Sequence, residues 1–310
     1  MKVSVVLLSY NRPEEIFRNV QELYHSLDRN VEIIVVDNNS LTPVFDIISP
    51  KFPEVKVIRL ADNLGVAGRN YGVQKAKGEF VITLDDDVFG FKMEDANVIV
   101  SKFESNPKLS AINFKIVDDV TKESVNWIHH RDVNEWVNIT FNTYEISEGA
   151  CAFRRSDFIA VGGYPAYFFI SHEGPDLALR LLNAGFSVIY FPKVEVRHAH
   201  SQVARVSWRR YYFDTRNLIW LVVRNMPAGL LIKTLIVGLG AQFIYSVRDG
   251  YVLYWIIAIR DAILKIKDVL SDRNPLKKEA ALKYKKMHSY NVGYLKLLKI
   301  RIFGKKGIRL

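Results

Sequence analysis

The sequence of 310 residues contains a single cysteine, Cys151, which excludes an internal disulfide framework and a zinc site built from cysteines. Neither a G-x-G-x-x-G dinucleotide fingerprint nor a G-x-x-x-x-G-K-[ST] phosphate loop is present. Charged residues make up 25% and apolar residues 49%, so a wholly disordered chain is excluded and a sizeable core is expected.

Acidic residues are scarce in the C-terminal third. Residues 201–310 hold 22 basic and 6 acidic residues, a net charge of +16, whereas residues 1–200 hold 21 basic and 27 acidic residues, a net charge of −6. This asymmetry predicts an anionic partner for the C-terminal third, either a membrane surface or nucleic acid.

Uncharged runs in this basic region are shorter than a membrane span. Residues 234–247 and 250–259 carry no charge, but a spanning helix needs about 20 apolar residues. Starting the first run at Met226 gives 22 residues interrupted by Lys233, so a single span is one alternative and an oligomer interface is another. We favour helices in the plane of a membrane surface, with aromatic residues near the lipid headgroups: Tyr245, Tyr251, Tyr254 and Trp255.

The N-terminal two thirds alternate apolar runs with helical spacing. Strands are predicted at residues 3–9, 31–36, 55–60, 79–84, 110–117 and 187–191, and helices at residues 14–27, 66–77, 94–104 and 175–183. Near-continuous apolar strands between helices indicate an α/β fold with a mostly parallel sheet covered on both faces. Residues 118–148 lack a clear period and are expected to be an irregular segment over the site.

Polar residues follow three of these predicted strands. Asp37 follows the second strand, Asn63 the third, and Asp85, Asp86 and Asp87 the fourth. Because ligands of open α/β sheets bind at the carboxyl ends of the strands, we expect these residues to line one site.

The aspartate triplet is the most informative motif. Adjacent carboxylates repel one another, and a hard divalent cation would relieve that repulsion and bridge to phosphate oxygens. Asp85 and Asp87, two positions apart, suit such a metal site, and a solvated acidic turn is the structural alternative.

Two further candidates also have structural alternatives. Asp37 could accept hydrogen bonds from a base or ribose, although aspartate is also common in turns. In the loop from Asn63 to Asn70, small residues would let a ligand approach, and Arg69 could meet phosphate or the aspartates. A closely packed helix start is the alternative for this loop.

Two acids flank a Gly-Pro pair at the start of the predicted helix 175–183. Glu173 is free to act as a general base, whereas Asp176 could instead cap the helix. His172 could orient Glu173 or simply pack.

Histidines occur in two pairs. His198 and His200 follow a strand, where a neutral imidazole could bind a metal ion. His129 and His130 have no such context, and we expect them at the surface.

In this order, the motifs resemble family 2 glycosyltransferases, which have the nucleotide-sugar-binding fold called GT-A. The resemblance covers about residues 1–200 and rests on Asp37, the loop 63–70, the aspartate triplet, Gly162-Gly163-Tyr164, residues 168–180 and His198.

The resemblance implies a role for each residue. Asp37 would contact the nucleotide base, while Asn63, Arg69, Asn70, Asp85 and Asp86 would lie along the donor sugar nucleotide. Asp87, with Asp85 and His198, would bind Mn²⁺ or Mg²⁺ on the diphosphate. The family inverts the anomeric carbon by direct displacement.

One departure concerns the Glu-Asp pair that the family places near the acceptor. Glu173 matches its first acid, but Gly174 replaces the second acid, which is the proposed base in many relatives. We therefore expect Glu173 to act as the base, with Asp176 as the second choice.

The sequence thus predicts a GT-A domain at residues 1–204, with a nucleotide-binding half at 1–117 and an acceptor half at 118–204. A basic helical tail follows at 205–310. The expected protein is a cytoplasmic enzyme, peripheral on the inner face of the cell membrane, that transfers a sugar from a nucleotide sugar to a lipid-linked or cell-surface glycan. Nucleic acid is not an expected partner, because the tail contains long uncharged stretches. The alternatives are a nucleotidyltransferase that makes the activated sugar and a non-catalytic binding protein.

Overall fold

The computed structural model describes residues 2–199 and 208–303. Its strands are β1 (Val3–Ser9), β2 (Glu32–Asp37), β3 (Lys56–Arg59), β4 (Phe80–Asp85), β5 (Val88–Phe89), β6 (Leu109–Asp118), β7 (Phe141–Asn142), β8 (Ala150–Arg154) and β9 (Ser187–His198). They form one nine-stranded sheet in the order β3-β2-β1-β4-β8-β6-β9-β5, with β7 paired to β9. Strands β1, β2, β3, β4, β6 and β9 point the same way, so the predicted mostly parallel sheet is confirmed.

Helices cover both faces of this sheet. They are α1 (Pro13–Ser26), α2 (Val44–Ile48), α3 (Gly68–Lys75), α4 (Met93–Glu104), α5 (Val133–Trp136), α6 (Arg155–Ala160) and α7 (Glu173–Asn183). Along β1, Val5 and Leu7 pack in a core layer with α1, α2 and α4, whereas Val6 packs in a second layer with α3, α6 and α7. Burial on both faces explains why the strand is apolar at nearly every position.

Strand β9 is longer than the sequence predicted. The expected strand ended at residue 191, but β9 continues to His198 after an irregularity in its pairing with β6. Pro192 and the charged residues Lys193, Glu195 and Arg197 hide this extension in the sequence. The extension carries His198 to the carboxyl end of β4.

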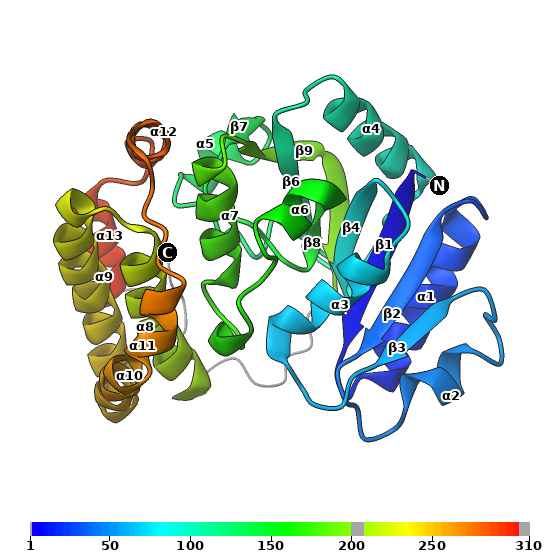
Figure 1. Ribbon diagram of the computed structural model, residues 1–310, viewed down its shortest axis with the longest axis horizontal. Coiled ribbons are helices and arrows are strands. Elements are labelled where there is room, and N and C mark those ends of the chain that lie inside the picture. The colour runs from blue at the N-terminus through cyan, green and yellow to red at the C-terminus, as the bar shows by residue number, and fades with distance from the viewer. Residues whose placement is uncertain (1, 200–207, 304–310) are drawn as a thin grey trace.

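The C-terminal region is helical, as predicted. Its helices are α8 (Trp208–Asn225), α9 (Ala228–Asp249), α10 (Val252–Leu264), α11 (Ile266–Ser271), α12 (Lys278–His288) and α13 (Tyr294–Phe303). Figure 1 shows them gathered at the end of the molecule opposite α1 and α2. The predicted boundary at 204/205 lies outside the described residues.

Helix α8 joins this region to the body. Trp220 and Val222 of α8 share a buried apolar cluster with Leu179 and Leu182 of α7, and with Phe168 just before α7. The tail is therefore packed against the GT-A-like body through α8.

Helix α9 presents apolar residues to solvent. It has 22 residues and, among the described helices, is the one long and apolar enough to cross a membrane, yet only 17% of its most apolar window is buried inside the structure. Four of its exposed apolar residues recur on one face at helical spacing: Ile232, Ile236, Phe243 and Val247.

Candidate functional site

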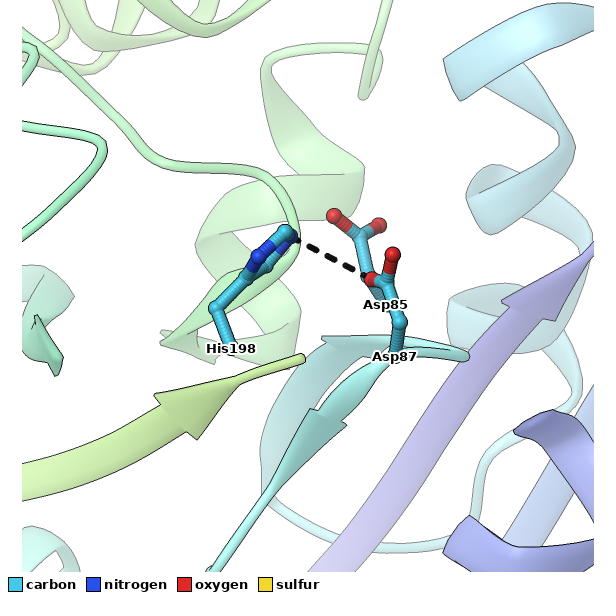
Figure 2. A group of neighbouring side chains, drawn as sticks. All are labelled: Asp85, Asp87 and His198. Carbon is cyan, nitrogen blue, oxygen red and sulfur yellow. Dashed lines mark ion pairs between the residues drawn. The ribbon is translucent and has the colours of Figure 1, made fainter. Parts of the chain in front are cut away.

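Two carboxylates and an imidazole lie together at the carboxyl end of β4. Asp85 ends β4, Asp87 precedes β5, and pairing of Val88 with His198 places the imidazole beside Asp87. His198 Nε2 lies 3.4 Å from Asp87 Oδ1, and one ligand atom from each of the three residues lies within 4.8 Å of the others (Figure 2). Carboxylate oxygens with one imidazole nitrogen suit a divalent cation such as Mn²⁺ or Mg²⁺.

Two arginines compensate the aspartate triplet. Arg12, just before α1, lies 3.1 Å from Asp86 and also pairs with Asp87, and Arg69 pairs with Asp85. Burial lowers the pKa of Arg69, but the charges of Asp85 and of neighbouring groups such as Tyr164 and Glu148 together raise it above its ordinary value. The repulsion expected within the triplet is therefore partly relieved by the protein itself.

The three carboxylates differ in accessibility. The Asp85 side chain is 44% exposed, whereas those of Asp86 and Asp87 are each 7% exposed. Burial raises the pKa of Asp86 to about 7, although the charge of Arg12 opposes this. Asn19 steadies the turn by donating to the carbonyl oxygens of Asp85 and Asp86. Asp85 is thus the carboxylate of the triplet most open to a ligand.

Asp37 lies at the end of β2, but its carboxylate is engaged within the protein. Its Oδ1 accepts from the backbone N–H of Ser40 at 2.8 Å, while its Oδ2 accepts from the N–H of Val44 and from Arg59. The side chain is fully buried. The turn interaction considered from the sequence is therefore present, and a contact with a nucleotide base stays a prediction.

The loop from Asn63 docks on a distant segment. Asn63 Oδ1 accepts from Asn38 Nδ2 and from the N–H of Gly65, both at 2.9 Å. The N–H of Val66 donates to the carbonyl oxygen of Phe169 at 2.9 Å. This brings the loop beside the residues that lead into α7.

The two predicted donor contacts at the start of α3 have different surroundings. Asn70 bonds both backbone groups of Tyr164, donating to its carbonyl oxygen at 2.8 Å and accepting from its N–H at 2.9 Å. Arg69 is instead directed at Asp85. Asn70 thus holds the Gly162-Gly163-Tyr164 turn, and Arg69 belongs to the metal-site cluster.

The backbone before α7 is strained. Phe169, Ser171 and His172 have φ angles of 67°, 78° and 66°, in the left-handed region that residues other than glycine rarely adopt. Asn217 of α8 holds this segment by donating to the carbonyl oxygens of Phe168, Ile170 and Ser171. His172 Nε2 lies 3.1 Å from the carbonyl oxygen of Asp214, so it packs on α8. Strain of this kind is often maintained at functional sites.

Glu173 begins α7 and is nearly enclosed. Only 3% of the surface of Glu173 is exposed, and its Oε2 has no hydrogen-bond partner among the described residues. Burial and the neighbouring charge of Glu148 raise the pKa of Glu173 well above its ordinary value.

Asp176 has a structural environment. It is fully buried, its Oδ2 lies 2.7 Å from Arg180 Nη2 and 2.8 Å from Arg224 Nη1, and its Oδ1 accepts from Asn225. The cap expected as an alternative is absent, because the N-cap residue is His172. A carboxylate held by two arginines is poorly placed to take a proton.

Glu148 and Arg12 are site residues that the sequence analysis did not single out. Glu148 precedes β8 and is partly exposed, and a Cβ built on Gly174 would lie 2.2 Å from its Oε1. Burial raises the pKa of Glu148 to about 7. In the sequence, Arg12 is an arginine after the first strand and Glu148 is an acid beside Gly149. Neither pattern indicates a site residue without knowledge of the fold.

The prediction that both His129 and His130 lie at the surface is wrong for His129. His130 is exposed, but His129 is 5% exposed and lies 3.1 Å from Thr143 Oγ1. The aromatic rings of Trp127, Phe141 and Tyr190 fold around it, and burial lowers its pKa to about 3. His200 lies outside the described residues.

A family model described as glycosyl transferase family 2 matches residues 4–162, which is half of the chain. The chain belongs to this family. The GT-A fold expected from the sequence is confirmed by solved structures of glycosyltransferases that superimpose on most of the family 2 chain.

Curated relatives of this family 2 chain include polysaccharide enzymes. The O-antigen chain rhamnosyltransferase WbaN of Salmonella anatum is 26% identical over 216 residues, covering 63% of this chain and 65% of that protein. The UDP-Glc:alpha-D-GlcNAc-diphosphoundecaprenol beta-1,3-glucosyltransferase WfaP of Escherichia coli is 31% identical over 100 residues, covering 31% of this chain and 39% of that protein. The chain therefore matches less than two thirds of the length of either relative.

A solved structure extends the likeness to the whole chain. The mannosyltransferase PcManGT from Pyrobaculum calidifontis, in complex with GDP-Man and Mn²⁺, superimposes with a TM-score of 0.56 at 15% identity. The match covers 98% of this chain and 88% of that one. At this identity the likeness shows the fold.

Proposed function

We propose that this protein transfers a sugar from a nucleoside-diphosphate sugar to a hydroxyl group of a glycan acceptor, with inversion at the anomeric carbon. The observation that carries the proposal is the cluster of Asp85, Asp87 and His198 at the carboxyl end of β4 in a family 2 fold. Ligands of such sheets bind at this edge.

Asp85, Asp87 and His198 would hold Mn²⁺ or Mg²⁺. The donor set and the exposure of Asp85 fit a divalent cation, and the relative PcManGT is described in complex with Mn²⁺ and a nucleotide sugar. A cation there would neutralise charge on the leaving diphosphate. Arg69 would orient the carboxylate of Asp85, and Arg12 would orient that of Asp87.

Asp86, Asn63, Asn70 and Asp37 would border the donor, as the family resemblance implies. Asp37 and Asn70 form hydrogen bonds to backbone groups, so we propose that they mainly maintain the shape of the donor site. Direct contact of Asp37 with a base would require a shift of Arg59.

The acceptor hydroxyl must lose a proton as it attacks the anomeric carbon. Direct displacement places this hydroxyl on the face of the anomeric carbon opposite the leaving diphosphate, so the proton acceptor must lie near that face. The sequence indicates Glu173, at the start of α7, as this proton acceptor. The strained segment lies directly before it.

The proposed acceptor is a lipid-linked or cell-surface glycan at the inner face of the cell membrane. Two relatives support this choice by their names: one acts on an O-antigen chain and the other on a sugar linked to diphosphoundecaprenol. The exposed apolar face of α9 and the +16 charge of residues 201–310 would hold the enzyme as a peripheral protein on anionic lipid.

Nucleotide binding tests the function directly. Calorimetric titration with UDP, GDP, dTDP and CMP, each with and without Mn²⁺, should show binding of one nucleoside diphosphate that depends on the metal ion. Asp87→Ala should weaken this binding at least about tenfold, because it removes one of the cation's ligands.

Asp28→Ala is the matched control, since Asp28 is exposed and lies outside the site. It should leave the affinity unchanged. A folded wild-type protein that binds none of the four nucleotides, with or without Mn²⁺, would contradict the proposed function.

A further inference from the structure

Transfer to a hydroxyl requires a carboxylate that is close to the donor and free to take a proton. Asp176 is committed to Arg180, Arg224 and Asn225, and Glu173 is 3% exposed. Glu148 is different, because it is partly exposed and no salt bridge to it is found among the described residues, although the charge of Arg69 lowers its pKa.

Glu148 occupies the space that a side chain at position 174 would need. A Cβ on Gly174 would lie 2.2 Å from Glu148 Oε1 and 3.1 Å from its carboxyl carbon. The nearby backbone N–H of Gly174 lowers the pKa of Glu148, which agrees with a carboxylate placed at the first turn of α7. Glycine at position 174 therefore makes room for an acid that comes from another part of the chain.

The backbone around Glu148 also runs beside the metal-site cluster. The N–H of Asp85 donates to the carbonyl oxygen of Gly149 at 3.0 Å, and Thr83 Oγ1 donates to the carbonyl oxygen of Glu148 at 2.7 Å. A Cβ on Gly149 would lie 2.1 Å from Asp85 Oδ2, so position 149 has no room for a side chain beside Asp85. Glu148 thus lies between the start of α7 and the donor edge of β4.

We infer that Glu148 is the catalytic base, and that its carboxylate replaces the acid absent at Gly174. This inference rests on the proposed function. As the acceptor oxygen bonds to the anomeric carbon, the bond from that carbon to the diphosphate breaks, and the diphosphate leaves with the electron pair. The hydroxyl proton passes to Glu148, which later returns it to water.

Glu173 supports this role as a neighbour. Burial and the proximity of Glu148 raise the pKa of Glu173 well above its ordinary value, so Glu173 is the acid of the pair that favours the protonated form. A general base works best when its own pKa is near the working pH, and the pKa of Glu148 is about 7. Glu148 therefore takes the role that the sequence predicted for Glu173 or Asp176.

The test compares Glu148→Gln with Glu173→Gln by hydrolysis of UDP-glucose, UDP-GlcNAc, GDP-mannose and dTDP-rhamnose in the presence of Mn²⁺. For the donor that the wild type uses, Glu148→Gln should lower kcat at least about 100-fold. It should leave the Kd of the matching nucleoside diphosphate within about twofold. Glu173→Gln should lose much less, because Gln mimics a protonated acid. Formate should partly restore turnover to Glu148→Ala.

Glu145→Gln is the matched control. Glu145 lies on the same segment and is buried, but its side chain faces His130 rather than the donor edge. This variant should keep kcat within about threefold. Thermal unfolding of each variant should show that it remains folded, and Glu148→Asp is the substitute if the glutamine variant does not.

The outcomes separate the inference from the function. Three results would each overturn the inference and leave the function standing. Glu148→Gln could hydrolyse the donor with the kcat of the wild type, Glu173→Gln could lose more kcat than Glu148→Gln, or Glu148→Gln could fail to bind the nucleotide. No nucleotide binding by the wild type would overturn both. If nucleotide binds without measurable hydrolysis, a crystal structure with bound donor decides, since Glu148 must then lie nearer the anomeric carbon than Glu173.

Discussion

The sequence offered three aspartates as candidate site residues: Asp37, Asp85 and Asp176. The structure distinguishes their roles by the groups that bind each carboxylate. Asp37 is held by backbone N–H groups and Arg59, and Asp176 by two arginines, whereas 44% of the Asp85 side chain is exposed. Buried carboxylates that are fully paired maintain structure, and a partly exposed one can bind a ligand. At the scale of the residue, the partners and not the residue type decide the role.

His129 makes a prediction about acid stability. Its pKa is about 3 in the folded protein and 6.5 ordinarily, so the folded state binds fewer protons than the unfolded state. Its contribution to stability is complete above pH 6.5 and is lost as the pH falls toward 3. Between pH 7.5 and 5.0 the free energy of unfolding should drop by about 2 kcal/mol from this residue alone.

Guanidinium denaturation of wild type and His129→Gln at both pH values measures this contribution. Glutamine can still bond to Thr143 but does not titrate, so the variant should lose about 2 kcal/mol less on acidification. An equal drop in the two proteins would show that His129 is not kept neutral by burial.

Helices α7 and α8 form the junction between the sheet and the C-terminal region. Asp176 of α7 pairs with Arg224 of α8, and Asn217 of α8 holds the strained segment that leads into Glu173. The C-terminal region therefore holds the backbone at the start of α7 through α8, in addition to any role at a membrane.

Removing the buried acid at this junction should destabilise the fold. Asp176→Ala leaves Arg180 and Arg224 without their shared partner in a buried site, which costs about 3–5 kcal/mol. Denaturant unfolding measures the loss.

Asp272→Ala is the control, because Asp272 lies 3.5 Å from the same Arg224 but is 47% exposed. Exposed ion pairs contribute at most about 1 kcal/mol, so this variant should be nearly as stable as the wild type. Similar losses in both variants would argue against a structural role specific to Asp176.

At the scale of the whole molecule, positive charge and an exposed apolar helix face are concentrated in the C-terminal third of the chain. Residues 1–200 carry a net charge of −6 and residues 201–310 carry +16, while α9 exposes an apolar stripe. A molecule of this kind can lie on anionic lipid through one end while its acidic body stays free.

Vesicle sedimentation tests this orientation. The full chain should bind vesicles that contain phosphatidylglycerol at low salt and bind poorly to pure phosphatidylcholine. Ile236→Glu should weaken binding severalfold, because it places a negative charge on the apolar stripe of α9.

Val98→Glu is the control, since it adds the same charge at an exposed apolar position on α4. Equal binding by Ile236→Glu and the wild type would contradict the membrane role. A dimer in analytical ultracentrifugation that Ile236→Glu breaks would instead identify the stripe as an interface between two copies.

Most elements and the gathering of acidic residues at the carboxyl end of β4 could be predicted from the sequence, because both depend on local patterns. Apolar periodicity marked β1 to β4 and the helices α1, α3 and α4 within a few residues, and Asp85 lies at the end of its strand. The family resemblance added an ordered set of motifs spread over about 200 residues.

Only the tertiary structure brings together residues that are far apart in the sequence. The extended β9 carries His198 to Asp87, α8 supplies Arg224 to Asp176, and Glu148 fills the space left at Gly174. Such pairings depend on strand register and helix packing, which no local pattern encodes. The sequence therefore determined the elements and the chemistry available at the edge of the sheet. The packing decided which carboxylates gather with His198, which one is paired with two arginines, and which one lies against Gly174.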